Sequence, residues 1–117
     1  MYDSLINHYT QLLKPIFPPD ADFLSEETTE DAIIIKVCWY LGSDPDRKHK
    51  RSRPIKIIIP RETIEDHNLE NDSDRKNADK KIFNFVKNKY KNFNPNHDFP
   101  QQEVPPAVEW IISSDLI

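Results

Sequence analysis

The sequence predicts a small α+β domain in which helices pack on one face of a sheet that contains an antiparallel hairpin. Two short segments alternate in strand fashion, and two longer segments space their apolar residues as amphipathic helices do. The predicted order is helix, strand, strand, short helix, long helix, strand. With 117 residues the chain can bury one modest core, so we expect residues 1–117 to form a single domain.

The first helix is predicted at residues 1–14. Its apolar residues recur at spacings of three and four and so share one stripe: Tyr2, Leu5, Ile6, Tyr9, Leu12 and Leu13. Pro15 disfavours helical geometry at Lys14 and therefore ends the helix. Residues 15–31 follow as an acidic connection, with six carboxylates from Asp20 to Asp31, and its "ADFL" leaves a short edge strand open.

Residues 32–60 are predicted to form a β-hairpin. The first strand, "AIIIKVCWYL", points alternate side chains inward: Ile33, Ile35, Val37, Trp39 and Leu41. The second strand, "PIKIIIP", repeats the pattern with Ile55, Ile57 and Ile59 inward. Because a polar loop joins them, the two strands most simply pair antiparallel. The loop, "GSDPDRKHKRSR", is then a long basic projection into solvent.

Residues 61–93 are predicted to be helical, with one turn after Pro60 and a longer helix that runs to about Asn92. Asp72 or Ser73 is expected to cap the longer helix. The apolar face of this helix holds Ala78, Ile82, Phe83, Phe85, Val86, Tyr90 and Phe93. A proline-rich loop is expected at residues 94–106. Residues 107–117 are expected to form a closing strand, with a helix as the alternative.

Three segments follow one another as hairpin strand, helix and closing strand: "IKIIIPRETIEDH", "DRKNADKKIFNFVKNKY" and "VEWIISSDL". In this order they resemble the bacterial family catalogued as domain of unknown function 1488, over about residues 32–116. The resemblance implies an α+β fold and a bacterial origin, and it implies no activity.

Two further segments, "LINHYTQLL" and "KNADKK", resemble the first helix and the lysine-bearing start of the last helix in double-stranded-RNA-binding domains. This resemblance implies the order helix, three strands, helix, and contacts from a helix start and a hairpin loop to neighbouring grooves of RNA. It requires a third strand in "ADFLSEE", and the glycine that usually precedes the lysines is missing here.

Charge is distributed unevenly along this chain of net charge −4. Residues 1–46 sum to −7, whereas residues 47–53 carry +5 and residues 75–91 carry +6. A basic loop and a lysine stripe are what contact with a phosphate backbone requires. The candidate binding residues are Arg47, Lys48, Lys50, Arg51, Arg53, Lys76, Lys80, Lys87 and Lys91. The alternative interpretation is a solvated surface that keeps neighbouring chains apart.

No residue pattern predicts catalysis, a metal site or a cofactor. The four histidines, His8, His49, His67 and His97, stand far apart, and none has a second ligand at helical or turn spacing. Cys38 is expected to be a buried structural cysteine, because nothing near it in the sequence would activate the thiol. Trp39 and Trp110 are expected in the core.

We therefore expect a non-catalytic protein that acts as a protein-interaction or oligomerising module. Its partner is then an unidentified protein or a second copy of this chain. In the second case, the acidic connection of one copy would contact the basic loop of the other. The alternative is a nucleic-acid-binding protein that uses the basic loop and the lysine stripe. Without a signal peptide or an apolar run long enough to span a membrane, the expected location is the cytoplasm.

Overall fold

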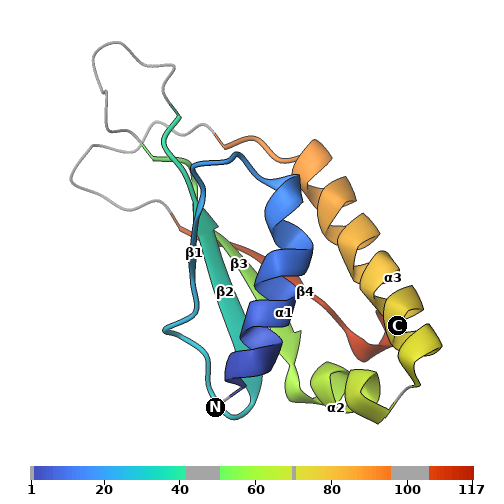
Figure 1. Cartoon of the computed structure of the whole chain (residues 1–117). Coiled ribbons are helices and arrows are strands. Elements are labelled where there is room, and N and C mark those ends of the chain that lie inside the picture. Colours follow the sequence, from blue (N-terminus) through green and yellow to red (C-terminus); the bar gives the residue numbers. More distant parts are fainter. Residues whose placement is uncertain (1, 42–50, 70, 96–105) are drawn as a thin grey trace.

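The computed structural model describes residues 2–41, 51–69, 71–95 and 106–117 (Figure 1). Within these residues the chain forms three α-helices and a four-stranded mixed sheet, which is an α+β fold as the sequence predicts. The predicted basic loop, with Arg47, Lys48 and Lys50, lies outside the described residues. So does most of the predicted proline-rich loop.

The sheet has the strand order β1-β2-β3-β4. The strands are β1 Asp22–Leu24, β2 Ala32–Cys38, β3 Ile55–Pro60 and β4 Val108–Ile111. The predicted antiparallel hairpin is formed by β2 and β3, in which Ile35 lies opposite Ile57. On the far side of β3, β4 runs parallel, with Trp110 opposite Ile57. The helices between β3 and β4 carry the chain back along the sheet, which makes the parallel pairing possible.

The helices are α1 Asp3–Leu13, α2 Arg61–Leu69 and α3 Asp72–Lys91. Short 3₁₀ turns follow α1 at Lys14–Ile16 and β4 at Ser114–Leu116. In Figure 1, α1 crosses one face of the sheet and α3 lies beside α1. The short helix α2 lies at the end of β3. We call this side of the sheet the covered face. None of the helices in the described part of the chain is long and apolar enough to cross a membrane.

The core lies between the helices and the covered face of the sheet. Alternate residues of β2 and β3 are buried, as the period of two predicts. The helices contribute Tyr9 and Leu13 from α1, Ile64 from α2, and Ile82 and Val86 from α3. At one end of the core the rings are close together, with Phe17, Trp39, Tyr90, Phe93 and Trp110 as neighbours. Trp39 and Trp110 are therefore core residues, as expected.

The elements differ from the sequence predictions in several details. The helix after Pro60 is nine residues long rather than one turn. Its Thr63 hydroxyl donates a hydrogen bond of 2.7 Å to the Ile112 carbonyl, which joins α2 to the residue after β4. The cap of α3 is Asn71, whose side chain accepts from the Asp74 N–H at 2.8 Å. β2 ends at Cys38 rather than at Leu41, and β4 covers only part of residues 107–117. The edge strand that the sequence left open in "ADFL" is present as β1.

The opposite side of the sheet, which we call the outer face, has none of the described helices packed on it (Figure 1). Its side chains alternate with the core residues along the strands: Leu24, Ile34, Lys36, Cys38, Lys56, Ile58, Glu109 and Ile111. Tyr40 follows them beyond β2. Leu24, Tyr40 and Ile111 are 39%, 48% and 53% exposed, respectively. Large apolar side chains thus remain in contact with solvent on this face.

We predict that Ile57→Ala lowers the free energy of unfolding by about 2–5 kcal/mol, because it leaves a cavity in the centre of the core. The measurement is urea unfolding of dilute protein, and the matched control is Ile111→Ala on the outer face. The control should cost less than about 1 kcal/mol, since its side chain is largely exposed. Equal losses in the two variants would contradict this assignment of the two faces.

Candidate functional site

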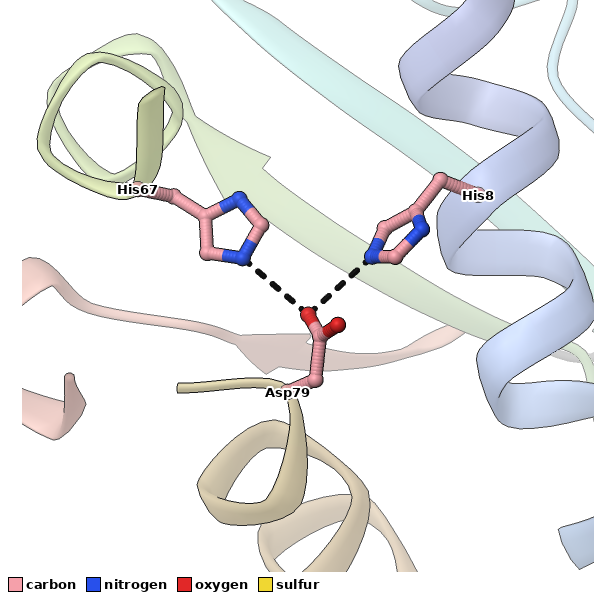
Figure 2. Close-up of side chains that lie close together, drawn as sticks. All are labelled: His8, His67 and Asp79. Carbon is pink, nitrogen blue, oxygen red and sulfur yellow. Dashed lines mark hydrogen bonds and ion pairs between the residues drawn. The ribbon is translucent and has the colours of Figure 1, made fainter. Parts of the chain in front are cut away.

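Three polar side chains from three different helices meet at one end of the core. They are His8 from α1, His67 from α2 and Asp79 from α3 (Figure 2). The Asp79 Oδ1 atom lies 3.1 Å from the His8 Nε2 atom and 3.0 Å from the His67 Nε2 atom. One carboxylate oxygen therefore bridges two imidazole rings.

Each of the three side chains lies at the margin of a buried helix face. His8 precedes the fully buried Tyr9, and Asp79 follows the buried Ala78. His67 is itself buried, one turn after Ile64. Because Tyr9, Ile64 and Ala78 draw their helices together to exclude water, the neighbouring polar groups are brought into contact.

The hydrogen bonds define the roles of the ring nitrogens. An ionised carboxylate only accepts, so both Nε2 atoms donate to Asp79. The remaining nitrogen of a neutral His67 ring, Nδ1, then accepts from the Tyr9 hydroxyl at 3.3 Å. Burial, and secondarily the negative charge of Asp79, raise the pKa of Tyr9 well above its usual range. The Tyr9 hydroxyl consequently keeps its proton and remains a donor.

Exposure falls from one histidine to the other. The His8 side chain is 43% exposed, the Asp79 side chain 19% and the His67 side chain 5%. The cluster therefore opens to solvent on the side of α1 and is closed on the side of α2. Among the described residues, the side-chain hydrogen bonds of both histidines go to Asp79 and Tyr9, so neither ring is paired with a serine, threonine or cysteine nucleophile.

This cluster is not recognisable from the sequence, because its members are distant along the chain. His8 and Asp79 are 71 positions apart, and His67 and Asp79 are 12 apart in different helices. A metal site is recognisable from sequence when its ligands are spaced within one helix or turn, and these three residues are not. Only the packing of the three helices brings the side chains together.

The predicted basic residues are divided among separate surfaces. Arg51 lies on the outer face, where it donates a hydrogen bond of 2.6 Å to Asp22 and stacks over the Tyr40 ring at 4.7 Å. Its hydrogen bond to Asp22 raises the pKa of the Arg51 guanidinium further above its usual range. The acidic connection and the basic run therefore meet within one chain at this point.

Cys38 also lies beside Arg51 and differs from its expectation. The side chain is half-buried on the outer face rather than fully buried. An Arg51 Nη2 donor lies 3.0 Å from the Cys38 Sγ atom. The outward register of β2 explains this position, because residues on either side of Cys38 point into the core.

On the other side of the sheet, three of the predicted cations flank two grooves along α3. Arg53 and Lys89 line a groove of about 620 Å³ with Phe93 and Trp110. Lys87 and Lys91 line a second groove of about 830 Å³, with Phe83 and Tyr90. Lys76 and Lys80 are exposed farther along α3. The predicted lysine stripe on α3 (Lys76, Lys80, Lys87 and Lys91) is therefore present. Arg51 and Arg53 do not form one continuous basic surface with it.

Comparisons with protein-family models, curated proteins and solved structures found no match for this chain. The resemblances to domain of unknown function 1488 and to double-stranded-RNA-binding domains therefore stay predictions. β1 lies where the second resemblance requires a strand, whereas β4 has no counterpart in the order that it implies.

We predict that Asp79→Ala lowers the free energy of unfolding by about 1–3 kcal/mol, because the buried His67 ring loses its acceptor. Chemical unfolding measures the change. The control is Asp66→Ala, which removes an exposed carboxylate next to His67 and should change stability by less than about 0.5 kcal/mol. Indistinguishable variants would show that the bridging carboxylate does not hold the three helices together.

Proposed function

We propose that the protein is a non-catalytic binding module that associates with a second copy of itself through the outer face of its sheet. The observation that supports this function is a continuous apolar row across three strands. Ile34 lies opposite Ile58, and Ile58 lies opposite Ile111, so their side chains adjoin on the outer face. A partly exposed apolar row of this kind is typical of a surface that binds another protein.

The charges beside this row favour a second copy as the partner. In the next row Lys36 lies opposite Lys56, and Lys56 lies opposite Glu109. Glu27 also reaches this row, where one of its carboxylate oxygens lies 3.1 Å from the Lys56 Nζ atom. Both signs are therefore present on one face, and a two-fold arrangement would place the lysines of one copy opposite the carboxylates of the other.

The edge of the sheet adds to the same surface. β4 is the last strand in the described sheet order, so one of its sides carries backbone groups with no strand partner. The exposed Ile111 lies on this edge strand. An interface over the outer face would cover both the apolar row and the adjoining edge. The proposal includes a bacterial origin and a cytoplasmic location, which rest on the sequence expectations.

We predict that the wild-type protein forms a concentration-dependent dimer and that Ile111→Lys is monomeric, because the new charge lies in the apolar row. Sedimentation velocity over a range of concentrations is the measurement. Asn84→Lys is the control, since it adds the same charge on the exposed side of α3. A wild-type protein that stays monomeric at about 100 μM, a concentration at which even micromolar dimers form, would refute self-association.

The second groove supports nucleic-acid binding as the second candidate function. Lys87 and Lys91 flank it together with the rings of Phe83 and Tyr90, and the Lys87 Nζ atom lies 6.0 Å from the Phe83 ring centroid. Cations beside partly exposed aromatic rings are the combination on which single strands bind and stack.

For this candidate, fluorescence anisotropy with single-stranded and double-stranded RNA and DNA is measured at several salt concentrations. If nucleic acid binds here, replacing Lys87 and Lys91 by serine should weaken affinity and lower the salt slope by about two, one for each lost phosphate contact. The control replaces Lys81 and Lys89, which lie outside the stripe, by serine. Absence of binding at low salt, or an equal effect of the two pairs, would exclude this groove.

A further inference from the structure

We propose that His8, His67 and Asp79 form a binding site for a divalent transition-metal ion of the Zn²⁺ class. This inference is independent of the proposed self-association. Imidazole nitrogen and carboxylate oxygen are the ligands that Zn²⁺ takes in sites with three protein ligands, where a water or another molecule completes the coordination. The three helices supply two such nitrogens and one such oxygen.

The distances between the ligand atoms suit one small cation. No two of the three ligand atoms are more than 4.8 Å apart. Tetrahedral Zn²⁺, with bonds of about 2.0–2.1 Å, places its ligand atoms about 3.3 Å from one another. The two nitrogen–oxygen distances, 3.1 and 3.0 Å, are already close to this value. The largest separation within the cluster would have to shrink by at most about 1.5 Å to reach this value.

The exposed histidine can make this approach. The His8 side chain is 43% exposed and so is less confined by neighbouring atoms than His67, which is 5% exposed. The two rings already face each other, with centroids 5.9 Å apart and planes inclined by 36°. The solvent-facing side of His8 also gives an ion access to the cluster.

A hydrogen-bond partner for the metal-bound ring is in place. When Nε2 of His67 binds a cation, its proton must move to Nδ1, which then needs an acceptor. The Tyr9 oxygen lies 3.3 Å away, and a hydroxyl can either donate or accept. Metal-ligating histidines almost always donate the second ring N–H to a hydrogen-bond acceptor, which orients the ring. Tyr9 is fully buried and so is held in position.

The donor set also decides which ions fit. Two imidazoles and a single carboxylate suit Zn²⁺, Co²⁺, Ni²⁺ or Fe²⁺, whereas Ca²⁺ and Mg²⁺ require mainly oxygen ligands. Binding would replace the His–Asp–His hydrogen bonds by metal–ligand bonds between α1, α2 and α3. The ion would therefore bind to the folded chain and stabilise the helix layer.

The test is calorimetric titration of the untagged full chain with Zn²⁺. The wild type should bind one ion per chain, and His8→Gln should weaken the affinity by at least about 100-fold, because an amide replaces one of three ligands. His8 is half-exposed, so this variant should fold, which circular dichroism checks. The control replaces His49 and His97, the histidines outside the described residues, by glutamine and should bind Zn²⁺ as the wild type does.

Two further measurements fix the location of the ion. Co²⁺ should give the visible absorption of a four-coordinate ion with the wild type and not with His8→Gln. Zn²⁺ should also raise the midpoint of urea unfolding in the wild type and leave that of His8→Gln unchanged. No binding by the wild type, or equal binding by the wild type and His8→Gln, would overturn the proposal and leave the cluster as a hydrogen-bond network alone.

Discussion

The structure depends on the apolar contact between the helices and the covered face of β2 and β3. Ile35 and Ile57 lie opposite each other at the centre of this face, and both are almost completely buried. The burial of apolar surface such as that of these two side chains is the main favourable term in folding. It contributes about 25 cal/mol per Å² of apolar area removed from water. The same two strands, through their outward residues, form the uncovered face on which the proposed function rests.

The two ends of the core between the helices and the covered face are filled by different kinds of side chain. One end is filled by aromatic rings around Trp39 and Trp110, which need large and closely fitted surfaces. At the other end, the Asp79 carboxylate accepts hydrogen bonds from two histidines, which come from two other helices. Buried polar groups require hydrogen-bond partners. Because this carboxylate is the shared partner of both imidazole rings, the polar side chains of α1, α2 and α3 can lie together at this end.

The local features of the fold could be predicted from the sequence. The period of two in "AIIIKVCWYL" and "PIKIIIP" identifies two strands and their inward residues, and the apolar stripe of residues 1–14 identifies the first helix. The parallel pairing of β4 and the His8–Asp79 contact were not predictable, because both join residues far apart in sequence. The Arg51–Asp22 pair was not predictable for the same reason. The charge pattern shows which segments are acidic or basic, but it does not show which acidic residue pairs with which basic residue.

The central claim is that one face of the sheet is the core and the other is the surface joining two copies. Isotope-filtered nuclear Overhauser measurements on mixed labelled and unlabelled protein test it directly. We expect contacts between copies at the methyl groups of Ile58 and Ile111, and none at those of Ile35 and Ile57. Contacts that map to α3, or the absence of any contact between copies at high concentration, would contradict the claim.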